Sequence, residues 1–114
     1  MTTQEQMRKG TTTIIILSLL ADADRPMYGY EIIRELEARS QGYFRFKEGL
    51  IYPRLHKLEH DGLLRSEWQG EEGTRRRKFY AITGSGRRRL EDELKGWQDF
   101  AANVNHLLGV ELAS

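Results

Sequence analysis

The sequence predicts a mainly α-helical protein with one small β-hairpin and a long helix at its C-terminal end. Residues 14–21 form an apolar run, and apolar residues recur at helical spacing within residues 28–40 and 48–61. Two segments with strand-like alternation then flank a polar turn at residues 69–74, and a heptad pattern runs from residue 90 to residue 108. This order is typical of a winged helix-turn-helix. We expect that domain in residues 1–83 and a C-terminal dimerisation helix in residues 84–114.

The first helix is expected over the apolar run from Ile14 to Ala21, which only Ser18 interrupts. The preceding threonines and isoleucines have high strand propensity, so the pattern alone also admits a strand. The two helices that follow favour a helix. A loop is expected at residues 22–26, a second helix at Tyr28–Ser40 and a short extended piece at residues 43–46.

The third predicted helix begins near Glu48 and ends at Gly62, and it is the candidate recognition helix. Its inward stripe is Ile51, Leu55 and Leu58. The opposite face carries Gly49, Pro53, His56, Lys57 and His60, with Tyr52 and Arg54 at its flanks. Pro53 is tolerated there because it lies barely beyond the first turn, where several N–H groups lack a helical partner anyway.

The predicted hairpin begins directly after the third helix. In its first strand Leu64, Ser66 and Trp68 alternate with charged residues, which is typical of a half-buried strand. The return strand is expected at residues 77–82. Because a two-stranded hairpin is only marginally stable alone, it must pack on the helices.

Positive charge is concentrated in one part of the sequence. The whole chain has a net charge of +1, yet residues 74–89 hold seven basic residues and no acidic one. A block of cations in a nearly neutral chain indicates a local anion-binding surface, and on a winged helix the expected anion is double-stranded DNA. A solvated surface without a ligand is the alternative.

The recognition helix would enter the major groove, and the hairpin would contact the phosphate backbone or the minor groove. Arg54 can pair with guanine or with phosphate, and only the first contact reads sequence. Tyr52 can equally lie at the edge of the core. The residues expected to contact DNA are Tyr28, Lys47, Glu48, Gly49, Tyr52, Pro53, Arg54, Lys57, Thr74, Arg75, Arg76, Arg77 and Lys78.

The last helix is expected over residues 84–108, with Thr83 as its N-cap. Its apolar positions repeat at steps of four and three residues, as in the seam of a coiled coil. A helix of about 37 Å is too long for the rest of the domain to cover, so the seam predicts a C2 homodimer on a palindromic operator. The expected interface is Leu90, Leu94, Trp97, Phe100, Ala101, Val104 and Leu108. Packing of the seam on its own domain is the alternative.

Several of these segments resemble the PadR family of bacterial transcriptional regulators. The matching stretches are Lys9–Thr11, Tyr28–Ile32, Glu48–Leu63, Arg77–Thr83 and Gly86–Arg87, in the family's order and spacing. The resemblance implies a winged helix-turn-helix with a single C-terminal dimerisation helix. It also implies repression of a nearby operon. Two positions depart from the family pattern: Lys47 replaces a small polar cap, and Gly84 stands where relatives often have proline or an acidic residue.

The same resemblance implies that a small aromatic or amphipathic effector relieves repression. Trp97 and Phe100 are three residues apart and therefore neighbours on the helix surface. Near a two-fold axis, Trp97 and its symmetry mate would form a flat aromatic slot for such an effector. Trp97 can instead be plain dimer core.

The composition of the chain excludes several other classes of protein. The chain of 114 residues has no cysteine, which excludes a disulfide framework and a thiolate zinc site. No apolar run approaches the ~20 residues that span a bilayer, and the first residues lack the order of a signal peptide. We therefore expect a cytoplasmic protein without a cofactor, a metal or a membrane partner.

Two further functions compete with DNA binding. His56, Glu59 and His60 match the H-x-x-E-H pattern of some zinc proteases, but they fall in the candidate recognition helix of a small chain. Such a chain leaves little room for a third ligand and a substrate cleft, so an enzyme is not expected. A winged helix can also be a protein-interaction module without DNA readout, which an electronegative wing would favour; the arm of this wing is basic.

Overall fold

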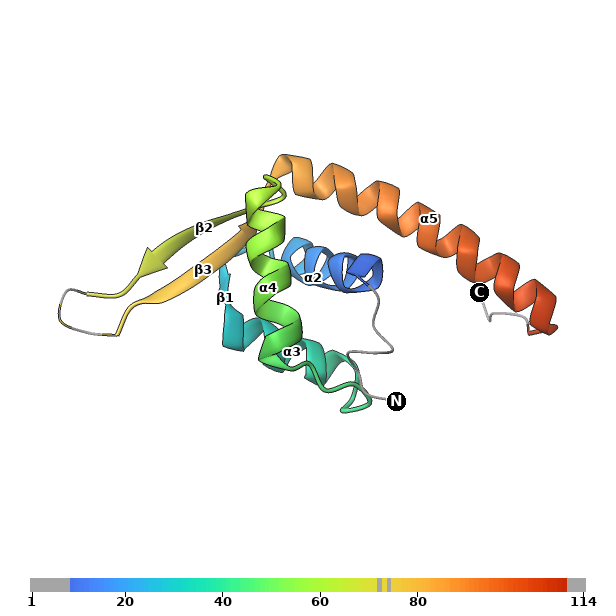
Figure 1. Cartoon of the computed structure of the whole chain (residues 1–114), viewed down its shortest axis with the longest axis horizontal. Coiled ribbons are helices and arrows are strands. Elements are labelled where there is room, and N and C mark those ends of the chain that lie inside the picture. The colour runs from blue at the N-terminus through green and yellow to red at the C-terminus, as the bar shows by residue number, and fades with distance from the viewer. Residues whose placement is uncertain (1–8, 72, 74, 111–114) are drawn as a thin grey trace.

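The structure, a computed structural model, describes residues 9–71, 73 and 75–110. The elements follow in the order α2 (Lys9–Ala23), β1 (Met27–Tyr28), α3 (Gly29–Arg39), α4 (Glu48–His60), β2 (Leu64–Gln69), β3 (Arg77–Ile82) and α5 (Gly84–Leu108). The β2–β3 hairpin and α5 project in opposite directions from a body built of α2, α3 and α4 (Figure 1). The molecule is therefore elongated, with extents of 59 × 30 × 22 Å.

Helix α2 is the centre of the core. Its side chains Ile16, Leu17, Leu19 and Leu20 are all buried, and the helix packs against α3, α4, β3 and α5. Neighbours on several sides explain why residues 14–21 of α2, apart from Ser18, are apolar on every side of the helix. The expectation of a helix rather than a strand is confirmed here.

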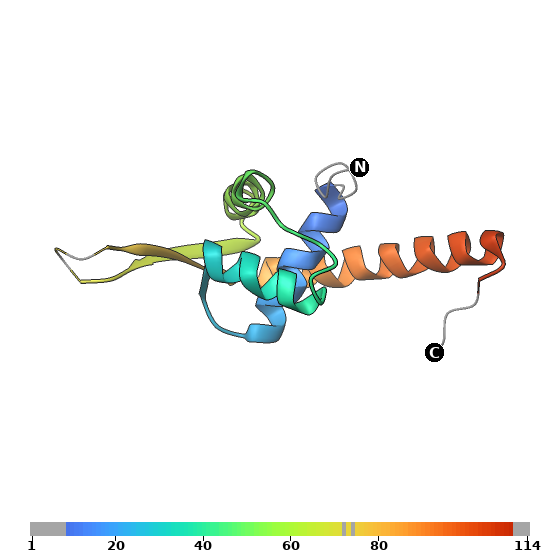
Figure 2. The ribbon, with the colours of Figure 1, turned by 90° about the horizontal axis from the view of Figure 1, so that it is seen from below.

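The sheet has three strands rather than the two that the sequence predicted. Tyr28 was expected at the start of a helix and Met27 was assigned to no element, but the two residues form β1 and pair with β3. The strand order is β1-β3-β2, with both pairings antiparallel. Strand β1 gives the hairpin a third partner on its inner edge, which a two-stranded ribbon needs for stability. Figure 2 shows the hairpin continuing beyond this short strand.

Helix α4 has the predicted orientation. Ile51, Leu55 and Leu58 are buried, and the helix ends where Gly62 adopts φ +78°. The Leu63 N–H donates to the Leu58 carbonyl over 2.9 Å, and the Gly62 N–H donates to the Glu59 carbonyl over 3.0 Å. This pair of bonds is a Schellman motif, so the chain turns directly from α4 into β2.

The hairpin is less buried than its alternation suggests. Leu64 is buried and Ser66 is half-buried, as expected, but Trp68 is 59% exposed, so the prediction of a half-buried strand is wrong for its outer part. The helices cover only the base of the hairpin (Figure 1). The predicted extended piece at residues 43–46 forms no strand with the described residues, although the rings of Phe44 and Phe46 lie 6.0 Å apart.

Thr83 connects three elements. Its hydroxyl accepts a hydrogen bond from the Gly86 N–H over 3.0 Å and donates one to the Gly62 carbonyl over 2.8 Å. Its own N–H donates to the Leu63 carbonyl over 3.1 Å. The predicted N-cap is therefore confirmed, and the same side chain joins the start of α5 to the turn after α4.

Substituting Thr83 by alanine is expected to lower the free energy of unfolding by about 1 kcal/mol, because the α5 N-terminus loses its cap. Chemical denaturation followed by circular dichroism measures the change. Thr83→Ser keeps the hydroxyl and is the matched control, which should retain most of the stability. Equal losses in the two variants would show that the methyl group, and not the cap, matters.

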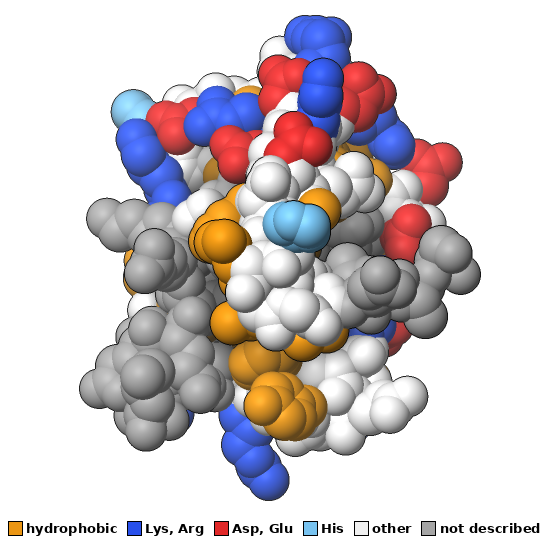
Figure 3. Space-filling model, turned by 90° about the vertical axis from the view of Figure 1, so that its right-hand side faces the viewer, with side chains coloured by type: hydrophobic (Ala, Val, Ile, Leu, Met, Phe, Trp, Pro, Cys, Tyr) orange, Lys and Arg blue, Asp and Glu red, His pale blue; other side chains and the backbone are white. Residues whose placement is uncertain are grey.

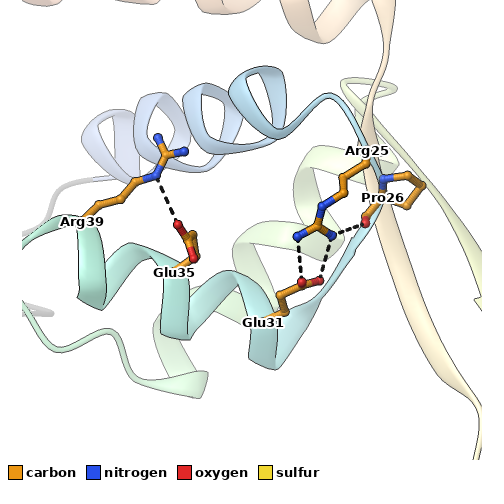
Figure 4. Close-up of polar contacts among 5 residues, drawn as sticks. All are labelled: Arg25, Pro26, Glu31, Glu35 and Arg39. Carbon is orange, nitrogen blue, oxygen red and sulfur yellow. Dashed lines mark hydrogen bonds and ion pairs between the residues drawn. The ribbon is translucent and has the colours of Figure 1, made fainter.

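Ion pairs fasten the loop between α2 and β1. The Arg25 guanidinium holds both carboxylate oxygens of Glu31, at 2.9 and 3.3 Å, and also donates to the Pro26 carbonyl (Figure 4). Asp24 pairs with Arg87 of α5 at 2.8 Å. The loop that leads into β1 is thereby joined to both α3 and α5.

In the part of the chain that the structure describes, no helix has the length and apolar character needed to cross a bilayer.

Candidate nucleic-acid interface

A groove of about 600 Å³ lies between the start of α3, the exposed side of α4 and the hairpin. We call it the wing groove. It brings together most of the residues that the sequence predicted for DNA contact: Tyr28, Glu48, Tyr52, Arg75, Arg76, Arg77 and Lys78. Gly29 and Tyr30 also line it, so the positive end of the α3 dipole lies beside it. Aromatic faces, cations and a helix N-terminus together favour a polyanion with flat groups.

The exposed face of α4 is open to a ligand. Lys47, Glu48, Gly49 and Pro53 are exposed, and Arg54 is half-buried at the flank of this face. Lys47 precedes the helix and makes no side-chain capping bond, because an ammonium group cannot accept one. The predicted phosphate contact Lys57 is exposed too, but it also pairs with Asp61 at 3.1 Å within the helix.

Tyr52 is both a packing residue and a groove residue. A Cβ at Gly29 would lie 2.3 Å from the Tyr52 ring, so only glycine lets this ring cross the first turn of α3. Tyr52 is half-buried and still lines the wing groove. Burial raises the pKa of its hydroxyl, and the nearby Glu48 carboxylate adds to the rise. Tyr52 is therefore a neutral hydrogen-bonding group at the wall of the groove.

The hairpin cations are held in different ways. The Arg77 guanidinium lies 4.7 Å from the centre of the Tyr28 ring, and this ring meets Phe79 edge-on at 5.4 Å. Lys78 pairs with Glu59 of α4 at 2.9 Å. Arg75 and Arg76 are exposed, and neither forms an ion pair with another residue that the structure describes. Thr74, also predicted to contact DNA, lies outside the described residues.

Trp68 is a groove residue that the sequence analysis missed. It lies opposite Lys78 in the β2–β3 pairing and lines the wing groove. Its indole is 59% exposed beside the hairpin cations, and an exposed aromatic face of this kind can stack with a flat group. The sequence feature that could have indicated Trp68 as a groove residue is its position near the polar turn, at the end of the strand farthest from the helices.

The seam of α5 is covered in its first half and open in its second. Leu90 is buried and Leu94 packs against the core, whereas Trp97 and Phe100 are 47% and 55% exposed. Ala101 and Val104 are half-buried, and Leu108 is exposed. Figure 3, which faces the end where α5 finishes, shows apolar side chains open to solvent.

A second groove, of about 680 Å³, runs between the start of α2 and the middle of α5. We call it the α5 groove. Ile14, Trp97 and Phe100 form its apolar walls, and the rings of Trp97 and Phe100 lie 6.2 Å apart in an edge-on arrangement. The body does not fill this groove, so an apolar surface of α5 is available to another molecule.

The residues of the H-x-x-E-H pattern do not converge. His56 and His60 are exposed, while the Glu59 carboxylate is occupied by Ser66 and Lys78. No three histidine, aspartate or glutamate side chains among the described residues are close enough to hold a metal ion.

Comparison with known proteins identifies the class of molecule that carries these grooves. Residues 16–92 match the model of the transcriptional regulator PadR-like family. The chain belongs to the PadR-like family. The match spans the whole winged helix from the middle of α2 and continues into α5. It confirms the prediction of a transcriptional regulator rather than an enzyme.

PadR-like relatives support the assignment along most of the chain. The sequence is 37% identical to the transcriptional regulator Rv3488 of Mycobacterium tuberculosis over 82 residues, which cover 72% of this chain and 73% of that protein. The structure of a transcriptional regulator from Clostridium thermocellum is 32% identical with a TM-score of 0.77, covering 85% of this chain and 92% of the other.

A PadR structure with a ligand has also been solved. The Bacillus subtilis PadR in complex with operator DNA is 28% identical to this PadR-like chain, with a TM-score of 0.63. The similarity covers 72% of this chain and 46% of the Bacillus subtilis chain. These neighbours confirm the predicted winged helix-turn-helix with a long C-terminal helix.

Proposed function

We propose that this protein is a sequence-specific DNA-binding repressor that acts as a homodimer. The observation that carries the proposal is the wing groove, in which an open face of α4 stands beside exposed arginines of the hairpin. The operator complex of the Bacillus subtilis relative supports the same type of ligand. From the proposed DNA ligand we also infer that the protein acts in the cytoplasm.

The residues of the wing groove and of the neighbouring exposed face of α4 have distinct proposed roles. The exposed face of α4 enters the major groove, where Gly49 permits close approach and Arg54 reaches a guanine or a phosphate. Lys47 and Lys57 contact phosphates beside the helix. Arg75 and Arg76 of the hairpin contact the backbone or a narrow minor groove. Tyr28, Glu48, Tyr52, Pro53 and Arg77 shape the surface between these two elements.

The homodimer is proposed to form along the open half of the α5 seam. Apolar side chains there are exposed without support from the body, and a second α5 related by a two-fold axis covers them with an identical surface. Two recognition helices related in this way read a palindrome whose half-sites lie about one helical turn apart.

The α5 groove is the proposed site for an effector that relieves repression. Its aromatic walls, Trp97 and Phe100, fit a planar apolar molecule. Asp92 at the same groove favours a positive charge on it, whereas Glu93 is paired with Arg89 at 2.9 Å. Quenching of Trp97 fluorescence by a panel of aromatic cations and phenolic acids tests the idea. An unchanged Trp97 signal across the panel would count against this site.

Gel-shift titration against the DNA upstream of the protein's own gene, at several salt concentrations, tests DNA binding. The affinity should fall steeply with salt, because each neutralised phosphate contributes a slope of about 0.9 in a log–log plot. Arg76→Ala should lower that slope by about 1.8, because the dimer loses one phosphate contact, worth about 0.9, in each protomer.

Lys95→Ala removes the same charge from an exposed position in the middle of α5 and is the matched control. It should leave the slope unchanged. A shift no stronger than that of random DNA would favour a protein-interaction module, and equal slopes for Arg76→Ala and Lys95→Ala would remove Arg76 from the interface.

A further inference from the structure

A small polar cluster joins the recognition helix to the wing. The Lys78 ammonium of β3 donates to Glu59 Oε1 of α4 over 2.9 Å, and the Ser66 hydroxyl of β2 donates to Glu59 Oε2. Both carboxylate oxygens of Glu59 are therefore used by the hairpin, one by each strand. Among the described side chains, Glu59 alone makes hydrogen bonds from α4 to the two strands.

The cluster is partly shielded from water. The side chains of Lys78 and Glu59 are 27% and 32% exposed, and the Lys78 ammonium lies 5.3 Å from the centre of the Tyr80 ring. Hydrogen bonds from Ser66 and then Lys78 lower the pKa of Glu59, and the bond to Glu59 raises the pKa of Lys78. Both groups are charged at neutral pH, so the ion pair is intact when the protein meets DNA.

The position of the cluster matters because the outer hairpin has little other support. Ser66 pairs with Tyr80 and is the last residue of β2 that is partly buried; beyond it Trp68, Gln69 and Arg77 are exposed. A two-stranded ribbon twists and bends readily when nothing holds it. The Glu59 carboxylate binds both strands of the hairpin where they extend beyond the helices, close to the hairpin arginines.

We propose that Glu59 is a positioning residue for DNA binding, which fixes the angle between the wing and the recognition helix through Lys78 and Ser66. Lys78 then pairs with Glu59 and does not contact a phosphate, which revises the DNA contact that the sequence predicted for it. The proposal rests on the proposed DNA binding for its effect on affinity. It also has a consequence for the free protein, which is independent of DNA.

Neutralising Glu59 separates positioning from simple electrostatics. Removing a carboxylate from a DNA-binding face strengthens binding when charge alone decides, because repulsion of the phosphates is relieved. A released wing must instead be ordered at the moment of binding, so Glu59→Gln is expected to weaken operator affinity about tenfold. The salt slope should stay unchanged, because no phosphate contact is lost.

Glu67→Gln is the matched control. Glu67 is an exposed carboxylate on the same strand as Ser66 but on the opposite face, where Gln69 donates to it. This variant makes the same charge change in the hairpin without touching the cluster. It should bind the operator as well as the wild type or slightly better.

Exchanging the two charges tests the role of Lys78. Lys78→Glu alone places two carboxylates together and should weaken binding more than Glu59→Gln does. The double variant Glu59→Lys with Lys78→Glu restores the ion pair with the wild-type net charge, and it should recover most of the affinity. No recovery, with a salt slope lower by about 1.8 for the two protomers of the dimer, would overturn the proposal and make Lys78 a phosphate contact.

Trp68 reports on the wing without any DNA. In a Trp97→Phe background it is the sole tryptophan, and it lies opposite Lys78 in the hairpin. Glu59→Gln should lower the fluorescence anisotropy of Trp68, while Glu67→Gln should not, and circular dichroism should show the same helix content in both. Unchanged anisotropy in Glu59→Gln would overturn the proposal. If the wild type bound no operator, the proposed function would fail while this measurement still decided the role of Glu59.

Discussion

Gly86→Ala is expected to lower the free energy of unfolding by about 3 kcal/mol, the upper end for an overpacked core position. Gly86 is buried in the first turn of α5, where a Cβ would lie 2.2 Å from the Leu63 carbonyl oxygen and 2.7 Å from Ile82 Cγ1. The Leu63 carbonyl is part of the backbone, so it cannot move away from the added Cβ as the end of a flexible side chain can. The start of α5 must therefore lift away from the hairpin base, and the Thr83 cap is lost with it.

Gly84→Ala provides the comparison, two residues earlier in the same helix. Its Cβ would meet only the Arg88 guanidinium, at an ordinary 3.6 Å. Alanine is also the better helix former, so this variant should equal or exceed the wild type in stability. Urea denaturation of both variants measures the difference. If Gly86→Ala were as stable as Gly84→Ala, α5 would not be packed on Leu63 as described.

Phe100→Glu is expected to convert the dimer into a monomer and to weaken operator binding about 100-fold or more, because two linked half-site contacts become one. Phe100 is 55% exposed, so the body does not need it for folding. In the proposed dimer the substitution brings a charge into an apolar seam and repeats it across the two-fold axis. Sedimentation velocity and gel-shift titration follow the two effects.

Ala102→Glu is the control for this charge. Ala102 is exposed on the side of α5 away from the seam, so a glutamate there should leave both mass and affinity unchanged. Circular dichroism should show a folded monomer for Phe100→Glu. A Phe100→Glu protein that remained dimeric would place the interface elsewhere than the open half of the seam.

Hydrophobic periodicity, together with the residues that begin and end the helices, predicted most of the fold. The bounds of β3 and α5 agree with the expectations of residues 77–82 and 84–108, because Thr83 interrupts the strand pattern and caps the helix that follows. Helix α4 was found from its apolar stripe and from Gly62. These signals are local, since each depends on residues within one or two turns of one another.

Features that depend on distant partners could not be predicted. Strand β1 has two residues, too few for any alternation, and it exists because β3 pairs with it. The ion pair of Lys78 joins residues 19 positions apart and depends on where α4 ends. From the sequence, Lys78 was one more positively charged residue of the wing. Only its packing against Glu59 distinguishes it from Arg75 and Arg76, which are exposed.

The close fit at Gly86 makes α5 a lever with its pivot at the body. From Gly86 to Leu108 the helix reaches about 33 Å, so a tilt of about 5° at the pivot displaces the far end by about 3 Å. Where a partner holds the far end, the same tilt instead swings the body, together with α4 and the hairpin. A molecule bound in the α5 groove, between the pivot and the far end of the helix, would therefore need to move the helix only slightly to change the spacing between two recognition helices.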